Sequence, residues 1–192
     1  MLASVRRTTS ETDVVASVAL RSNSRMSSWI DTGTGFLDHL LIQYAFHSGL
    51  SLKLCCIGDM WIDWHHVAED VGIVLGLLIA KLFCCLKSSR YSHAVLPMDE
   101  VLVRCCLDLS GRGGLFWLDE RLRSAPAVEM AWTTLDSVAR CANLSLHVDV
   151  LKGTNAHHIS EAVLKAFGIC CRRALEVVSF SSTKSIPLIV WG

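Results

Sequence analysis

One short pattern occurs twice in this chain of 192 residues, each time at the same point in a similar succession of elements. The motif HHxxE stands at residues 65–69 and again at residues 157–161, after an apolar strand-like segment and a short turn. Each copy opens a long stretch whose apolar residues have helical spacing. Recurrence in the same order indicates an internally duplicated unit. We expect a single α+β domain over residues 1–192 with two similar halves, about 1–92 and 93–192, each with its sheet in one layer and its helices in the other.

Hydrophobic periodicity predicts a similar order of strands and helices in the two halves. Near the start, a strand at 12–20 is expected to form a hairpin with a short strand around 29–30. The other elements expected in the first half are a helix at 35–49, strands at 50–57 and 60–62, and a helix at 65–87. Those expected in the second half are strands at 95–96, 101–109 and 115–118, a helix at 131–142, a strand at 144–150 and a helix at 157–178.

Composition argues against several classes of partner. Lys+Arg 18 balance Asp+Glu 18, so the chain has no excess of positive charge for a nucleic acid or an anionic membrane. The longest apolar run, 71–80, is far shorter than the roughly 20 residues of a spanning helix, and the first residues lack the apolar region of an export signal. Most of the nine cysteines stand as adjacent pairs in apolar stretches, which favours buried thiols in a reducing compartment. We expect a cytoplasmic protein.

The duplicated motif has the spacing of a metal site. Adjacent residues at a helix start point about 100° apart, whereas residues three or four apart share a face. The two histidines of each motif therefore aim differently, and one motif offers ligands to two ions. With two further histidines, the set supplies three imidazoles and one carboxylate per ion, which leaves open positions on an octahedral ion for a substrate. The candidate ligands are His39, His65, His66, Glu69, His147, His157, His158 and Glu161.

The ligand types do not determine which metal binds. Imidazoles suit zinc, iron, nickel and copper, and the carboxylates admit manganese. A single HHxxE motif is more often only a polar helix start, and the duplication is what favours a dinuclear site. Asp59, Asp63 and Asp70 are candidates to orient the imidazoles. Turn chemistry is an alternative role for Asp59, and a charged helix start is one for Asp70.

Several basic and hydroxyl side chains could together clamp a phosphate group. An arginine binds a phosphate through its bidentate fork, and a lysine binds it as a point charge. Taken singly, each of these residues is an ordinary surface residue. The candidates are Arg90, Arg112, Lys165, Ser182, Thr183 and Lys184.

Over nearly all of residues 7–184 the chain resembles the imidazoleglycerol-phosphate dehydratase family. The motifs that carry the resemblance are Arg7-x-Thr9-x-Glu11-Thr12, Thr32-Gly33-x-Gly35-Phe36-Leu37-Asp38-His39, Asp63-x-His65-His66-x-x-Glu69-Asp70, Pro97-Met98-Asp99-Glu100, Asp108-Leu109-Ser110-Gly111-Arg112, Leu146-His147, His157-His158-Ile159-x-Glu161 and Ser182-Thr183-Lys184. The resemblance implies a carbon–oxygen lyase of histidine biosynthesis, which converts imidazoleglycerol phosphate to imidazole acetol phosphate and water.

The resemblance also implies an assembly and a set of roles. It implies an octahedral 24-mer with its active sites at subunit contacts and with two manganese ions per site, held by the eight ligands named above. Glu11 is the implied acid/base. The residues implied to bind substrate are Glu11, Gln43, His47, Arg90, Arg112, Lys165, Ser182, Thr183 and Lys184. Trp64, Val67 and Ser185 depart from the family pattern, which bears on efficiency more than on the type of reaction.

The expected ligand set agrees with a dehydration. The reaction removes a weakly acidic C–H proton and expels hydroxide beside an imidazole ring, and both steps ease if the ring is bound by two metals as an imidazolate. Two other functions stay open at this point. A dinuclear metallohydrolase would also use neighbouring ions, although such sites usually depend on bridging aspartates. An inactive metal-binding oligomer is the other, and the presence of Glu11, Arg90, Arg112 and Lys184 argues against it.

Overall fold

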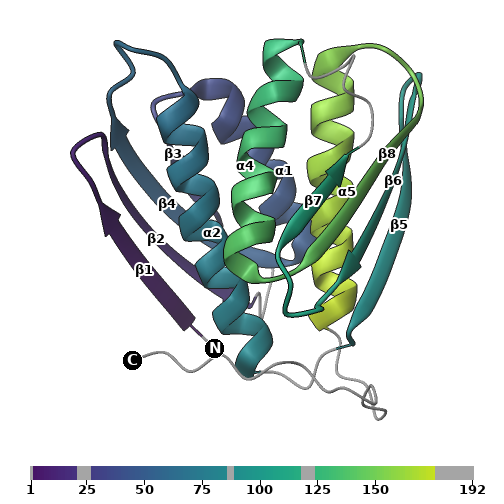
Figure 1. The fold of residues 1–192 in the computed structure, drawn as a ribbon, viewed down its shortest axis with the longest axis horizontal. Helices are drawn as coiled ribbons and strands as arrows, with labels where there is room; N and C mark the ends of the chain where they lie inside the picture. The colour runs from purple at the N-terminus through teal and green to yellow at the C-terminus, as the bar shows by residue number, and fades with distance from the viewer. Residues whose placement is uncertain (1, 21–26, 86–88, 118–123, 176–192) are drawn as a thin grey trace.

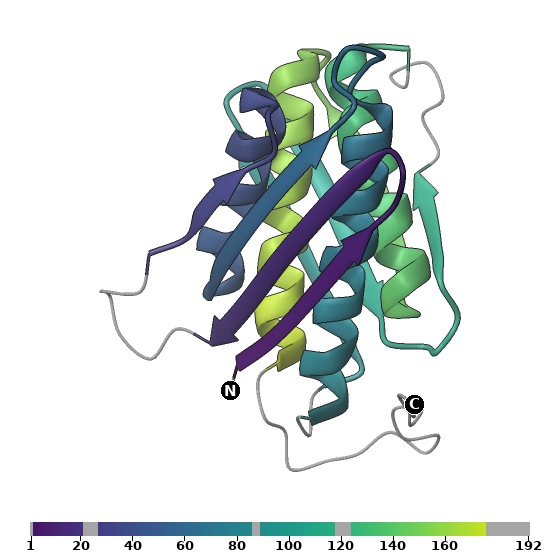
Figure 2. The ribbon, with the colours of Figure 1, turned by 90° about the vertical axis from the view of Figure 1, so that its left-hand side faces the viewer.

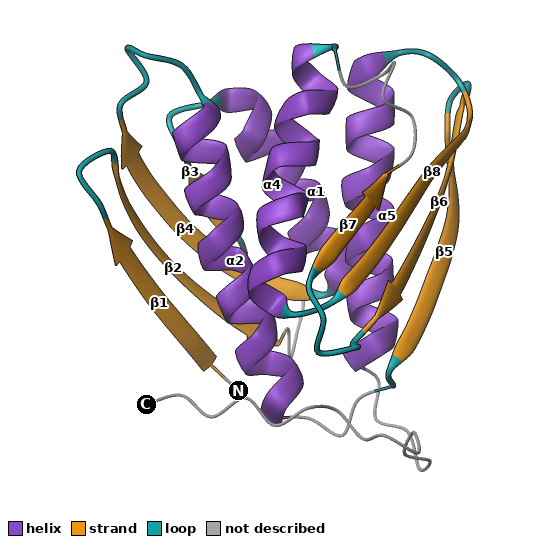
Figure 3. Ribbon diagram, viewed as in Figure 1, coloured by secondary structure: helices purple, strands orange, loops and turns teal. Residues whose placement is uncertain are grey.

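The computed structural model describes residues 2–20, 27–85, 89–117 and 124–175, and these form two sheets with helices packed between them (Figure 1, Figure 3). The elements of the first half are β1 (Leu2–Thr8), β2 (Thr12–Leu20), β3 (Trp29–Asp31), α1 (Gly35–Ser48), β4 (Leu50–Gly58) and α2 (His65–Cys85). Those of the second half are β5 (Tyr91–Met98), β6 (Val101–Asp108), β7 (Gly114–Trp117), α4 (Pro126–Ala142), β8 (Ser145–Lys152) and α5 (Ala156–Leu175). The predicted α+β fold of two sheet-and-helix halves is confirmed.

The two sheets have the same topology. The strand order is β1-β2-β4-β3 in the first sheet and β5-β6-β8-β7 in the second. In both, the first three strands are antiparallel and the last strand, β3 or β7, runs parallel to its neighbour. Figure 2 shows the first sheet from its outer side, with the helices behind it. The internal repeat therefore corresponds to a repeated three-dimensional unit.

Several local predictions in the first half are wrong. The strand at 12–20 does not form a hairpin with residues 29–30, because β2 lies between β1 and β4 while β3 pairs with β4. Residues 60–62 form a turn rather than a strand, closed by a hydrogen bond from the Ile62 N–H to the Asp59 carbonyl at 2.8 Å. The strand β1 was not predicted at all.

Each sheet buries one face against the helices. Along β2, Val14, Ala16 and Val18 are almost completely buried, whereas Val15 between them is 49% exposed. This alternation follows from the two-residue period of a strand. The same period splits two of the cysteine pairs: Cys56 and Cys105 are buried, but their neighbours Cys55 and Cys106 are only partly so. The expectation of uniformly buried cysteines is therefore wrong for the strands.

The helices of the two halves pack in crossed pairs. α2 of the first half lies against α4 of the second, and α5 of the second half lies against α1 of the first. Glycines permit both contacts, since a Cβ atom built on Gly76 would lie 2.8 Å from the carbonyl oxygen of Val138, and one on Gly168 would lie 2.8 Å from that of Tyr44. Both glycines follow the first histidine of their motif by eleven residues. The repeat thus includes the packing between the halves.

Helices α1 and α4, which are shorter than α2 and α5, end in the same way. The cap residue that follows α1 is Gly49 and the one that follows α4 is Asn143, and both have a left-handed backbone, with φ of 69° and 52°. Glycine and asparagine are the residues that adopt this conformation most readily at a helix end. Gly49 directly precedes β4, and only Leu144 separates Asn143 from β8, so the two caps align the halves residue by residue. Among the described residues, no helix is long and apolar enough to cross a membrane.

We predict that Gly76→Ala lowers the free energy of unfolding by about 1–3 kcal/mol, because the new methyl group would force α2 away from the α4 backbone. Gly35→Ala is the matched control, since no atom lies within 4 Å of a Cβ built there. Both variants should be compared with the unchanged chain by chemical denaturation at one protein concentration. Equal stability of the two variants would contradict the proposed close packing.

Candidate metal centre

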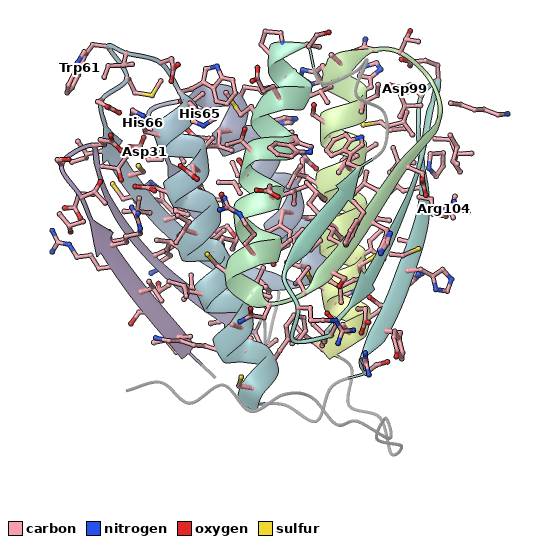
Figure 4. All side chains as sticks on the ribbon, viewed as in Figure 1. Asp31, Trp61, His65, His66, Asp99 and Arg104 are labelled. Carbon is pink, nitrogen blue, oxygen red and sulfur yellow. The ribbon has the colours of Figure 1, made fainter. Side chains whose placement is uncertain are left out.

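Both HHxxE motifs lie at the same end of the helix layer, drawn uppermost in Figure 1. Figure 4 labels His65 and His66 at this end of α2, and Asp99 at the same end of the second sheet. Polar side chains cap the two helix starts. The Oδ1 atom of Asp63 accepts the His65 N–H at 2.7 Å, and the Oδ1 atom of Asn155 accepts the N–H groups of the second motif's histidines. These caps satisfy N–H groups that lack partners within the helix.

The second motif forms a cluster with a histidine from the first half. His39 on α1 has its Nε2 atom 3.1 Å from the Oε2 atom of Glu161, and the Nε2 atom of His157 lies 3.4 Å from the same oxygen. The ligand atoms of these three residues all lie within 4.8 Å of one another. The His39 Nε2 atom is buried and is not aligned for a hydrogen bond with any described residue. A buried nitrogen beside a carboxylate and a second imidazole, without such alignment, fits a position for a metal ion.

The charge of Glu161 is stabilised by its neighbours. Burial by itself would raise the pKa of this carboxyl, but the interactions with Lys165 and His39 outweigh burial and lower the pKa below its ordinary value. The Lys165 Nζ atom lies 2.7 Å from the Oε1 atom of Glu161, opposite the oxygen that faces the histidines. The side chain is therefore held as a carboxylate, the form that binds a cation.

The other histidine of the second motif points elsewhere. The rings of His157 and His158 are nearly perpendicular, at 83°, with centroids 6.0 Å apart. The Nδ1 atom of His158 lies 3.0 Å from the Oε2 atom of Glu100, and its Nε2 atom lies 3.8 Å from the Oδ2 atom of Asp99. The ligand atoms of these three residues form a second group within 4.8 Å. The two histidines of the second motif therefore face different groups of potential ligands.

The first motif is arranged differently. The Nδ1 atom of His66 lies 2.9 Å from the Oδ2 atom of Asp59, and this hydrogen bond raises the pKa of His66 above its ordinary value. The Glu69 carboxylate faces neither histidine but lies 3.3 Å from the Arg140 guanidinium on α4. In the described part of the chain, His65, His66 and Glu69 are not brought together as three potential ligands of one ion.

The expected acid/base residue lies beside the first motif. The Oε1 atom of Glu11 is 3.9 Å from the Nε2 atom of His66. Its turn, between β1 and β2, is fixed to α2 by Asp70, which accepts hydrogen bonds from the Arg7 guanidinium and the Thr12 hydroxyl. Asp70 is therefore a structural anchor for this turn, and within the described part of the chain it makes no hydrogen bond to an imidazole.

His147 lies apart from both groups. It projects from the outer face of β8, where its ring stacks on Phe116 with centroids 4.6 Å apart. Because its strand neighbours Leu146 and Val148 point into the core, His147 points away from the helices and from the other histidines. It lines a hollow of about 320 Å³ together with Tyr91 and other residues of the second sheet. One chain therefore does not bring all eight candidate ligands together.

The candidates for binding substrate are also divided. Lys165 adjoins the histidine cluster, as noted above. Arg90 lies at the opposite end of β5 from the Asp99 turn, about 25 Å away for a strand of this length, and pairs with Asp108 at 2.7 Å. Arg112 follows β6 at that same far end. On α1, Gln43 and His47 follow His39 toward the C-terminal end of the helix, and the His47 Nδ1 atom is 2.9 Å from the Gln43 carbonyl oxygen. Ser182, Thr183 and Lys184 lie outside the described residues.

One residue of the site had no role in the sequence analysis. Glu100 occupies the β5–β6 turn, which corresponds in the repeat to the β1–β2 turn that carries Glu11. An alignment of the two halves at these turns is the signal that would have identified it.

Comparison with known proteins shows the family of this chain. The family model for imidazoleglycerol-phosphate dehydratase matches residues 32–171. The chain is 39% identical over 180 residues to the imidazoleglycerol-phosphate dehydratase of Chlorobaculum parvum, with 92% of each sequence covered. It is 41% identical over 179 residues to that of Bordetella pertussis, with 91% of each covered.

Two solved structures of this family also match the chain. The imidazoleglycerol-phosphate dehydratase of Staphylococcus aureus matches with a TM-score of 0.77 and 36% identity, over 91% of this chain and 98% of that one. The enzyme from Pyrococcus furiosus matches with a TM-score of 0.79 and 30% identity, over 95% of this chain and 100% of that one. The chain is therefore an enzyme that belongs to the imidazoleglycerol-phosphate dehydratase family.

Proposed function

We propose that this enzyme dehydrates imidazoleglycerol phosphate to imidazole acetol phosphate at a dinuclear manganese site. The observation that carries the metal site is the cluster of His39, His157 and Glu161, in which a buried imidazole nitrogen without an aligned partner faces a second imidazole and a carboxylate. A mixture of imidazole nitrogen and carboxylate oxygen is compatible with Mn²⁺. The dehydratase activity follows from the family, and the metal site is our assignment.

The residues divide between two ions by the directions of their side chains. His39, His157 and Glu161 would hold one ion, because their ligand atoms already converge. His66 and His158 each have the Nδ1 atom engaged by a carboxylate, so each would bind through Nε2 and would contribute to the other ion. His65, Glu69 and His147 would complete the two ligand sets. When bound, manganese would act as a Lewis acid toward the imidazole ring of the substrate.

The comparison of the two halves suggests why one chain does not bring all candidate ligands together. Aligned on the helix caps Gly49 and Asn143, His39 corresponds to Thr133, and His147 corresponds to Lys53 on β4. Each half thus has a single candidate ligand outside its motif, His39 on α1 or His147 on β8, and the two lie in different elements. The first motif therefore has no counterpart of His39 packed beside it, which supports completion of its ligand set by another copy of the chain.

The separation of the phosphate-binding candidates supports the same assembly. Arg90 and Arg112 lie at the opposite end of the second sheet from the Asp99 turn, about 25 Å by strand length, which is too far to serve one small substrate together with the candidate ligands at the motif end of their own chain. Lys165, by contrast, already adjoins Glu161. We propose a homo-oligomer with sites at subunit contacts, in line with the octahedral 24-mer that the resemblance implies.

The residues of this chain would each perform a limited task. The arginines and lysines would hold the phosphate and so align the carbon chain of the substrate with the acid/base group. Glu11 would move a proton, since its side chain is 52% exposed and its Oε1 atom lies 3.9 Å from a candidate ligand of the same site. Trp64 directly precedes the first motif and Val67 lies within it, but neither is among these groups.

We predict that metal-stripped protein forms no imidazole acetol phosphate and that added Mn²⁺ restores product formation. Phosphate release should be measured in the same samples, because a metallohydrolase would release phosphate instead. Neither product from a protein that still binds two metals would indicate an inactive metal-binding oligomer.

We predict that Glu11→Gln lowers kcat by about 10²–10⁴-fold, the range typical of a lost acid/base group, while the manganese content stays unchanged. Asp13→Asn is the matched control, because it removes one negative charge from the same hairpin at a side chain that pairs with Arg6 on the outer face. Unchanged turnover in Glu11→Gln would show that the assigned acid/base role is wrong.

We predict that two inactive variants complement each other. His147→Ala and His66→Ala would each inactivate every site in a uniform oligomer. If the two residues of one site come from different chains, random mixing after dissociation and reassembly should restore about a quarter of the sites. No recovery in mixed oligomers of normal size would mean that one chain supplies both residues.

A further inference from the structure

The first hairpin of each half ends in an acidic turn close to its own motif. In the first half the β1–β2 turn carries Glu11, and in the second half the β5–β6 turn consists of Asp99 and Glu100. The two turns correspond because β1-β2 and β5-β6 occupy the same places in their sheets. The second turn packs against the loop that leads into α5, where a Cβ built on Gly153 would lie 3.1 Å from the Glu100 carbonyl. Close backbone packing therefore fixes the base of the Glu100 side chain.

Glu100 contacts a single nitrogen of His158 with both of its carboxylate oxygens. The distances from Nδ1 are 3.2 Å to Oε1 and 3.0 Å to Oε2. A carboxylate only accepts hydrogen bonds, so the Nδ1 atom must carry the proton. In the neutral ring the Nε2 atom then has the free lone pair that a metal requires. The contact thus selects both the tautomer and the orientation of the ring.

The second histidine of the first motif makes the same kind of Nδ1 contact, with a different carboxylate. The Nδ1 atom of His66 is bound by Asp59, which stands in the loop between β4 and α2. The side chain of Asp59 is 5% exposed, whereas that of Glu100 is 50% exposed. The two halves therefore orient the second histidine of the motif through carboxylates from different loops. The recurrence of the Nδ1 contact, despite the change of partner, argues that it serves the histidine rather than the turn.

We propose that Glu100 is a positioning residue that holds His158 with its Nε2 atom available to a metal ion, as Asp59 holds His66. This inference rests on the proposed metal site. A separate ion bound by Asp99, Glu100 and His158 is the competing explanation for their proximity. The geometry favours positioning, because the Nδ1 atom that would face such an ion is already engaged by Glu100, and Asp99 lies 3.8 Å from the other nitrogen.

Two variants of Glu100 test the proposal by metal binding. In Glu100→Ala the affinity for one of the two manganese ions should fall by about 10–100-fold, the usual cost of removing a group that orients a ligand. Glu100→Gln should retain most of the affinity, because the amide oxygen still accepts the Nδ1 proton. The control is Glu129→Gln, which removes one negative charge in the first turn of α4, at the same end of the molecule. Titration calorimetry of the metal-free full chain with Mn²⁺ measures all four proteins.

A second measurement does not need the metal. Solid-state ¹⁵N NMR of metal-free, histidine-labelled protein reports which ring nitrogen carries the proton. The His158 signals, assigned with His158→Gln, should indicate the Nδ1–H tautomer in the unchanged chain and in Glu100→Gln, and a mixture of tautomers in Glu100→Ala. A merely structural role for Glu100 would leave this ratio unchanged.

The outcomes separate this inference from the function on which it rests. Equal manganese affinity in Glu100→Ala and in the unchanged chain would overturn the positioning role, as would equal losses in Glu100→Ala and Glu100→Gln, which would indicate direct binding by the carboxylate. If the unchanged chain bound no manganese, the proposed function would fail. The Nδ1–H tautomer and its loss in Glu100→Ala would in that case still support the orientation of His158 by Glu100.

Discussion

Close backbone contact between helices of opposite halves is the constraint on which the remaining structure depends. Gly76 brings α2 against α4, and Gly168 brings α5 against α1. Each half therefore buries its motif helix against a helix of the other half as well as against its own sheet. This exchange places His39 of the first half beside His157 and Glu161 of the second. A larger residue at Gly168 would separate α1 from α5 and with them the ligands of the candidate site.

The approximate symmetry of the fold conceals a functional asymmetry. The helix pairs, the sheet orders and the two HHxxE motifs all repeat, but His39 and His147 have as counterparts Thr133 and Lys53. The second motif consequently meets a third potential ligand inside the chain, whereas the Glu69 carboxylate of the first meets Arg140. If the active sites form between subunits as proposed, the duplicated chain supplies two unequal parts of such a site, and His147 on the outer face of β8 belongs to the part that another copy would complete.

Sequence patterns predicted the parts of the structure that depend on local periodicity and on the repeat. The helices that begin at the motifs, the helix from Gly35 and the central strands β4 and β8 were all expected. The edge strand β1 was missed because its inward residues are only partly buried and two arginines interrupt its alternation. The start of α4 was placed too late because the signal of Pro126 at the first helical position was not used.

The arrangement of the candidate site depended on pairings that periodicity does not encode. That His39 joins the second motif follows from the crossed helix pairs, and that Arg90 lies far from the histidines of the two motifs follows from the antiparallel pairing of β5 with β6. Neither pairing can be derived from one strand or helix considered alone. The contact between Glu100 and His158 likewise could not be predicted from a single element, because it joins the β5–β6 turn to the start of α5.

The direction in which His147 points depends on the register of its strand. Its place opposite Cys106 is set by the pairing of β8 with β6, and β-strand side chains alternate between faces. A slip of one residue in that pairing would turn the imidazole into the core and bring Leu146 and Val148 to the surface. A misfolded copy would then lack both the ligand and the surface that presents it. If the active sites form between subunits as proposed, correct strand register is therefore a condition for a complete site, and a chain with the wrong register could not contribute its histidine to one.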